Sequence, residues 1–132
     1  MVREPNDYSF MADLTASDIR KVHDRIMGPE GDHRILSEPG LEELVFRANL
    51  VPDAIQKAAL VLYSLRAYPV FREGNNETAI DLCAQVLAAD SIRISGEIKE
   101  LAELADGVDS FTVEPEDIGN WLMQNTEKAV FS

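Results

Sequence analysis

The chain has 132 residues, of which 24 are acidic and 12 basic, so its formal net charge is −12. This charge disfavours binding to nucleic acid and to anionic membranes. No apolar run approaches the roughly 18 residues that span a bilayer, and the first residues, MVREPNDYSF, lack the apolar stretch of a signal peptide. Cys83 is the single cysteine, which excludes an intrachain disulfide and is typical of a cytoplasmic protein.

The first third of the chain predicts two helices separated by a loop. Thr15 and Asp18 are suited to capping a helix. Its buried face would carry Ile19, Val22, His23 and Ile26. Residues 28–40, GPEGDHRILSEPG, hold three glycines and two prolines and therefore predict a loop. A short helix then carries Leu41, Leu44 and Val45.

The rest of the chain predicts four more helices and almost no strand. Pro52 suits the first turn of the next helix, which leads into a turn at 69–76. A central helix follows, apolar enough to be buried on more than one side; it carries Ala79, Ile80, Cys83, Val86 and Leu87. Another amphipathic helix carries Ile98, Leu101, Leu104, Ala105 and Val108, and Pro115 begins the last one. We find no repeat and no linker, so residues 1–132 predict one compact all-α domain.

Four segments in order resemble the death-on-curing (Doc) branch of the Fic/Doc (Fido) family. They read VHDRIMG, SEPGLEELVFRA, PVFREGNNETA and ELADGVDSFTVEPEDIGNWL, and the similarity spans about residues 14–124. The resemblance implies an all-α domain with a central buried helix and, beside the loop 68–76, a short β-hairpin flap. It also implies a toxin-like enzyme that moves AMP or phosphate from a nucleotide to a protein hydroxyl, with ATP and Mg²⁺ as cofactors.

The family's catalytic histidine has no counterpart in this chain. In the signature H-x-F-x-(D/E)-(G/A)-N-(G/K)-R-T-A, its position falls on Pro69, which cannot titrate. A slip of one residue places Tyr68 there, and a phenol with a pKa near 10 is a poor base at neutral pH. Neither alignment supplies a general base, so we assign no catalytic residue.

The phosphate-binding arginine of the family is replaced by Glu77. A guanidinium donates paired hydrogen bonds to phosphate, whereas a carboxylate repels it. Gly74, Asn75, Asn76 and Glu77 still offer backbone N–H groups at a helix start, where anions bind; Glu77 belongs to this phosphate-binding set by position only.

Two further positions of the signature match the family. Glu73 stands where relatives bind Mg²⁺, and Phe71 is the aromatic anchor expected to pack inward. The alternative for the whole stretch is that Gly74 and Asn75 only form the turn and start the helix.

Three titratable side chains outside the signature have structural interpretations that we favour. His23 would lie at the edge of the core and bond a neighbouring loop, although the pair with Asp24 is also a relay or metal-pair candidate. His33 would lie in a solvated acidic loop, where adventitious metal binding is the alternative. Cys83 would be a packed thiol on the central helix and not a nucleophile.

These observations predict a Doc-like domain that is catalytically impaired and acts as a binding or regulatory module. Its ligand would be a protein, either an antitoxin or a basic partner, and nucleotide and Mg²⁺ would bind weakly or not at all. One alternative is an active AMP- or phosphotransferase. A second alternative is an acidic interaction protein that has no relation to nucleotides. No residue pattern indicates the oligomeric state.

Overall fold

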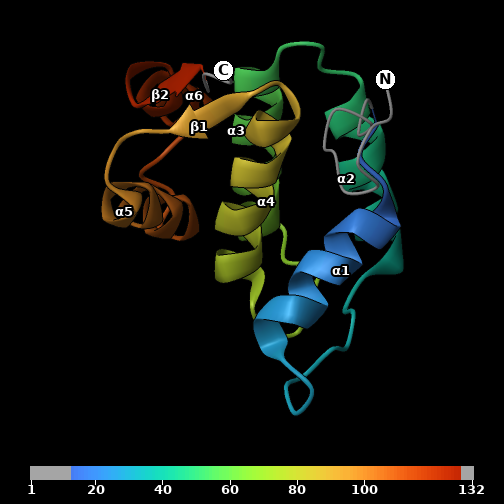
Figure 1. Cartoon of the computed structure of the whole chain (residues 1–132). Coiled ribbons are helices and arrows are strands. Elements are labelled where there is room, and N and C mark those ends of the chain that lie inside the picture. Colours follow the sequence, from blue (N-terminus) through green and yellow to red (C-terminus); the bar gives the residue numbers. More distant parts are fainter. Residues whose placement is uncertain (1–12, 129–132) are drawn as a thin grey trace.

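The computed structural model describes residues 13–128, and this part of the chain is mainly helical (Figure 1). Its helices are α1 (Ala16–Met27), α2 (Glu38–Asn49), α3 (Ala54–Ala67), α4 (Asn75–Ala89), α5 (Ile98–Asp109) and α6 (Pro115–Gln124). Two short strands, β1 (Ile92–Ile94) and β2 (Thr126–Lys128), pair in antiparallel fashion. The predicted all-α fold class is confirmed.

Helix α1 begins where the sequence predicts it. The hydroxyl of Thr15 accepts a hydrogen bond from the N–H of Asp18 (3.1 Å), and the carboxylate of Asp18 accepts one from the N–H of Thr15 (2.9 Å). This capping box satisfies N–H groups that have no partner inside the helix. The helix ends before Gly28, whose φ of 75° is a conformation that glycine adopts without strain.

The predicted loop 28–40 is too long, because α2 already begins at Glu38. Ser37 caps the helix by accepting a hydrogen bond from the N–H of Gly40 (2.9 Å). Pro39 is tolerated in the first turn, where its missing N–H leaves no bond unmade. The glycine and proline that suggested a loop therefore form the start of a helix.

Two other predicted boundaries also shift. Pro52 lies before α3, whose first turn is capped by Asp53 accepting a hydrogen bond from the N–H of Gln56 (2.9 Å). The loop predicted at 68–76 is shorter by two residues, because α4 begins at Asn75. It connects two helices that pack against each other, as expected.

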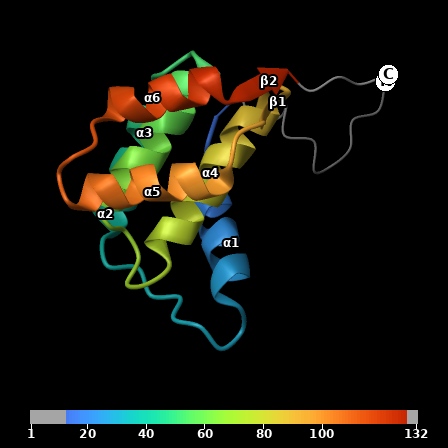
Figure 2. The ribbon, with the colours of Figure 1, turned by 90° about the vertical axis from the view of Figure 1, so that its left-hand side faces the viewer.

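Helices α3 and α4 pack together at the centre of the domain (Figure 1). Helices α1 and α2 lie on one side of this pair, and α5, α6 and the sheet lie on the other (Figures 1 and 2). The buried residues of α4 are Thr78, Ala79, Leu82, Cys83, Val86 and Leu87. Since this helix contacts α1, α3, α5 and β1, the prediction that it is buried on more than one side is confirmed.

Helices α5 and α6 lie across α3 and α4 (Figure 2). Pro115 occupies the first turn of α6, as predicted. The short hairpin that the resemblance implies would lie beside the loop 68–76, whereas the small two-stranded sheet pairs Ile92 with Lys128 and Ile94 with Thr126. It joins the segment after α4 to the segment after α6, whereas the loop between α3 and α4 has a single bridge, from Phe71 to Ile35.

Among residues 13–128, no helix is both long enough and apolar enough to cross a membrane.

We predict that Cys83 reacts with a thiol reagent only after unfolding. Its side chain is fully buried, and this burial raises the pKa of the thiol to about 12. The reactive thiolate is therefore scarce and inaccessible. In native buffer the reagent should label Cys83 far more slowly than in denaturant.

A Lys99→Cys variant provides the matched control, because Lys99 is exposed on α5. One of its two thiols should then react at once and the other slowly. Equal, fast labelling of both thiols would contradict the burial of the central helix.

Candidate functional site

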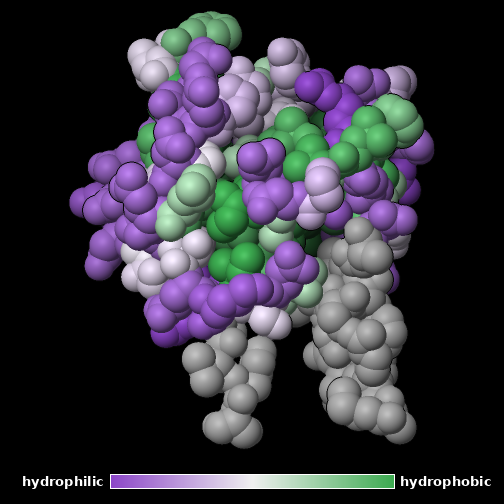
Figure 3. Space-filling model, turned by 90° about the horizontal axis from the view of Figure 1, so that it is seen from above, coloured by the Kyte–Doolittle hydropathy of each residue, from purple (hydrophilic) through white to green (hydrophobic). Residues whose placement is uncertain are grey.

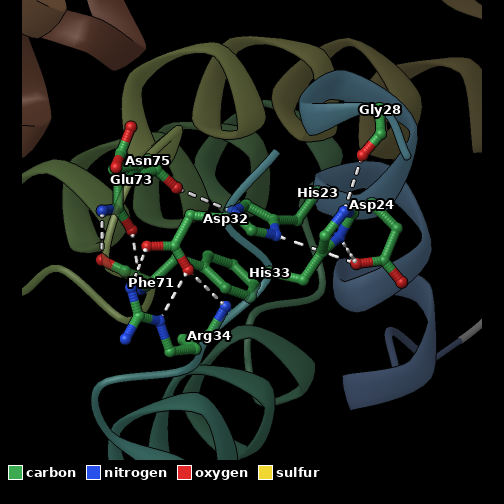
Figure 4. Close-up of polar contacts among 9 residues, drawn as sticks. All are labelled: His23, Asp24, Gly28, Asp32, His33, Arg34, Phe71, Glu73 and Asn75. Carbon is green, nitrogen blue, oxygen red and sulfur yellow. Dashed lines mark hydrogen bonds and ion pairs between the residues drawn. The ribbon is translucent and has the colours of Figure 1, made fainter. Parts of the chain in front are cut away.

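The loop between α3 and α4 is held against the segment that leads into α2. The N–H of Leu36 donates to the carbonyl of Val70 (2.7 Å), and the N–H of Arg72 donates to the carbonyl of Arg34 (3.1 Å). These bonds bring the chain around residues 32–36 alongside residues 70–72. Two segments that are separate in sequence thus form one site with the end of α1 (Figure 4).

His23 of α1 and Phe71 of the loop form the buried centre of this site. Both side chains are almost fully buried, and their rings stack with centroids 3.7 Å apart at an angle of 6°. The imidazole Nε2–H donates to the carbonyl of Glu73 (2.7 Å). The predictions that Phe71 packs inward and that His23 bonds a neighbouring loop are confirmed.

Asn75 uses its whole side chain to hold the loop. Its Oδ1 accepts hydrogen bonds from the N–H groups of Val70 (3.2 Å) and Phe71 (3.0 Å), and its Nδ2 donates to the carbonyl of Phe71 (2.7 Å). Three polar backbone groups of a tight loop are satisfied in this way. The asparagine of the signature therefore has a complete structural function.

Gly74 lies directly beneath the end of α1. Its φ of 82° is left-handed, and a Cβ at this position would lie 2.5 Å from Sδ of Met27. Any other residue would therefore need both a strained backbone and a displaced Met27. The close approach that glycine permits here is to a protein side chain.

The first turn of α4 has no side-chain cap. Asn76 Oδ1 and Thr78 Oγ1 are buried and have no hydrogen-bond partner among the described residues. Glu77 is exposed in this turn, where a carboxylate interacts favourably with the helix dipole. The same charge repels an anion that approaches the free N–H groups.

The two candidate positions for the catalytic residue both lie on the surface. Tyr68 is 67% exposed at the end of α3, and Pro69 is exposed beside it. The Tyr68 side chain lines a groove of about 280 Å³ between α2 and α3, together with Glu43 and Arg47. No histidine occupies either position, so a base for a target hydroxyl is not supplied by this part of the loop.

Two arginines near the loop are paired with one aspartate. Arg34 contacts the carboxylate of Asp32 through Nη2 (2.9 Å) and Nε (3.1 Å), and Nε of Arg72 lies 3.3 Å from it. Hydrogen bonds from Arg34, more than charge, lower the pKa of Asp32 to about 2. Both guanidinium groups are therefore engaged by a protein carboxylate.

His33 lies in an exposed loop, as predicted, and both of its ring nitrogens are also hydrogen-bonded. Its Nδ1 lies 2.7 Å from Oδ1 of Asp24, and its Nε2–H donates to the carbonyl of Gly28 (2.6 Å). The hydrogen bond with Asp24, followed by that with Gly28, raises the pKa of the imidazole. The two histidines lie within eleven residues of one another, but the sequence alone does not indicate that His33 contacts Asp24.

A second surface feature lies at the other end of the molecule, between α3 and α6. A groove of about 540 Å³ is lined by both apolar and polar residues. Its lining comprises Val51, Asp53, Ile55, Gln56, Ala59, Leu60, Pro115, Glu116, Gly119, Asn120 and Met123. Figure 3 shows this end of the molecule, with apolar side chains gathered between polar ones.

No protein-family model matches the chain, and no curated protein matches it. The resemblance to the Doc branch therefore depends on the four sequence segments alone.

We predict that Asn75→Ala destabilises the domain by about 1–3 kcal/mol, because it leaves backbone N–H groups of the loop without an acceptor. The neighbouring Asn76→Ala should change the free energy of unfolding by less than about 0.5 kcal/mol, since Asn76 Oδ1 has no hydrogen-bond partner among residues 13–128. Denaturant unfolding of both variants measures the difference. Equal losses would show that Asn75 does not hold the loop.

Proposed function

We propose that this chain is a non-catalytic, protein-binding module of Doc-like fold. Its partner would be a basic, amphipathic segment of another protein, and the groove between α3 and α6 would receive it. The observation that carries this proposal is the composition of the groove: its lining is mainly apolar and includes two carboxylates, Asp53 and Glu116.

The apolar part of the groove is suited to a helical segment. Val51, Ile55, Leu60 and Met123 line it, and Met123 is 69% exposed. A partner helix could place apolar side chains at three- and four-residue spacing into such a groove. Burial of exposed apolar surface, at about 25 cal/mol per Å², would supply the main favourable term.

The charge of the groove favours a basic partner. No lysine or arginine is among its lining residues in the described part of the chain. The net charge of −12 adds a long-range attraction for cationic segments. Charge therefore provides selectivity, and apolar contact provides affinity.

The geometry of the signature loop also supports a binding function over transfer. The residues that match the family, Phe71, Gly74 and Asn75, are used in packing, close approach and loop bonds. The positions that would perform chemistry hold an exposed proline and an exposed glutamate, Pro69 and Glu77. Pro69 has no group that can accept a proton from a hydroxyl, and Glu77 cannot donate hydrogen bonds to a phosphate as the family's arginine does.

We predict that a helical peptide with leucines on one face and lysines on the other binds the full chain. A peptide with the same leucines but glutamates in place of lysines should bind much more weakly. Met123→Lys should raise the dissociation constant of the lysine peptide at least about tenfold, because it removes apolar contact and adds a like charge. Fluorescence anisotropy of labelled peptides gives the dissociation constants.

Ile98→Lys is the matched control, because Ile98 is also a large exposed apolar residue but lies on α5 outside the groove. It should leave the affinity unchanged. If Met123→Lys has no effect, or if both peptides bind equally well, the groove is not the binding site and this proposal fails.

A separate prediction distinguishes the module from the active-transferase alternative. We expect no upward shift in melting temperature with millimolar Mg²⁺-ATP compared with Mg²⁺ alone. A nucleotide at one hundred times its dissociation constant would stabilise the protein by about 2.7 kcal/mol, which differential scanning fluorimetry detects. A clear shift would favour the transferase.

The Glu77→Arg variant extends this test. It replaces a carboxylate, which repels phosphate, with a guanidinium that donates paired hydrogen bonds at the start of α4. We expect this variant to gain nucleotide binding. A folded variant that gains none would indicate that the start of α4 only begins a helix.

A further inference from the structure

Both histidines of the chain face the same carboxylate, although they come from different segments. His23 and Asp24 lie in the last turns of α1, and His33 lies in the loop that follows (Figure 4). His33 Nδ1 is 2.7 Å from Asp24 Oδ1, and His23 Nδ1 is 3.9 Å from the same oxygen. The candidate ligand atoms of these three side chains all lie within 4.8 Å of one another.

The hydrogen bonds made by Nε2 of each imidazole determine which ring nitrogen can bind a metal ion. Nε2 of His23 contacts the carbonyl of Glu73, and Nε2 of His33 contacts the carbonyl of Gly28. A carbonyl can only accept, so each Nε2 must carry a hydrogen. In the neutral form of each ring, Nδ1 then has a lone pair for a metal ion. At His33 the ion would replace the proton through which Nδ1 donates to Asp24.

We propose that His23 Nδ1, Asp24 Oδ1 and His33 Nδ1 form a binding site for a divalent transition-metal ion of the Zn²⁺ class. The three atoms would be the protein ligands, and water would take a fourth position. Access for ion and water is open, because the side chains of Asp24 and His33 are 58% and 37% exposed.

The buried ring of His23 is the independent observation that supports a ligand here. Its Nδ1 is fully buried, lies next to Asp24 and has no hydrogen-bond partner among the described residues. Buried nitrogens normally have a partner, and one without a partner requires an explanation. A bound cation would supply that partner without moving the ring from its stack on Phe71.

The hydrogen bonds that hold the two imidazoles are of the kind found around metal-binding histidines. Histidine ligands usually donate their second ring N–H to a backbone carbonyl or carboxylate, which fixes the tautomer and orients the ring. Both histidines do this here, through Glu73 and Gly28. The ring orientations are therefore set by the fold before any ion binds.

Two of the three spacings require only small adjustments. Ligands at about 2.0–2.1 Å in a tetrahedral site lie roughly 3.3 Å apart. The distance between Asp24 and His33 must open slightly from 2.7 Å, and that between Asp24 and His23 must close slightly from 3.9 Å. Rotation of the exposed Asp24 side chain can accommodate both changes. The two Nδ1 atoms lie within 4.8 Å of each other, and bringing them to the same spacing requires a shift of His33 on its exposed loop.

The local charge also favours a cation. Asp32 acts on His33 from the same loop, while its own positive partners, Arg34 and Arg72, contact its carboxylate. The site lies at the C-terminal end of α1, where the helix dipole favours positive charge. Two imidazole ligands select transition ions over Mg²⁺ and Ca²⁺, which prefer oxygen.

A bound ion would fasten the loop 28–33 to α1. Because His23 also bonds Glu73, the same ion would stiffen the contact between α1 and the loop that precedes α4. This role is distinct from the Mg²⁺ position at Glu73 that the Doc resemblance implies, since the Glu73 carboxylate is not among the three side chains.

The decisive experiment is a Zn²⁺ titration of the full chain, first stripped with a chelator that is then removed. Long-range ¹H–¹⁵N spectra of the imidazoles are simple to assign, because the chain has two histidines. We expect both Nδ1 resonances to shift together and to stop shifting at one equivalent, while both Nε2 atoms remain protonated. The melting temperature should rise, and excess Mg²⁺ should not displace the ion.

Variants test the ligands without disturbing the buried ring. His33→Ala and Asp24→Asn should each weaken Zn²⁺ binding by about 100-fold or more, measured by competition with a chromophoric chelator. Glu103→Gln is the matched control, because it removes an exposed carboxylate on α5 and should not change the affinity.

Two results would overturn the proposal. A titration in which Zn²⁺ shifts the His33 resonances alone would indicate an adventitious ion only. A His33→Ala variant that binds Zn²⁺ as tightly as the unaltered chain would place the ion elsewhere on the acidic surface.

Discussion

The stacked pair of His23 and Phe71 is the constraint on which this half of the structure depends. It joins the end of α1 to the loop before α4, and the hydrogen bond from His23 to the carbonyl of Glu73 fixes the position of that loop. Both rings are buried, so the loop cannot move without exposing an aromatic surface or breaking a buried hydrogen bond. The left-handed Gly74 beneath Met27 follows from the same close approach. What looks locally like a flexible glycine–asparagine turn is therefore anchored to the core through Phe71 and His23.

Most of the fold could be predicted from the sequence because its helices are amphipathic and capped by local residues. The start of α1 needs only Thr15 and Asp18, which are three positions apart. The strands could not be predicted in this way. Each has three residues, too few for an alternating pattern to be recognised, and their pairing joins Ile92 to Lys128 across the chain. The start of α2 was missed because proline and glycine are typical of loops, although both are permitted in a first helical turn.

The features of the candidate site also fall into two groups: those set by residues adjacent in sequence and those set by contacts between distant segments. The turn at Gly74 and Asn75 could be predicted, because the conformation of a few residues determines it. The approach of His33 to Asp24 could not, because it depends on the path of the loop after Gly28. That path is set partly by the pairing of residues 34–36 with residues 70–72. The groove between α3 and α6 depends on the packing of helices about sixty residues apart, which no local pattern describes.

The residues that match the Doc signature and the residues that differ from it have different roles in the structure. Phe71, Gly74 and Asn75 match the Doc pattern, and each makes contacts that the loop needs irrespective of any ligand. Pro69 and Glu77 depart from it; both are exposed, and neither contributes to the buried loop contacts. A domain that kept only the first set would retain its shape and lose nucleotide transfer, because packing and chemistry are carried by different side chains. This separation is the physical reason to look for function away from the loop, at the apolar groove and at the two histidines.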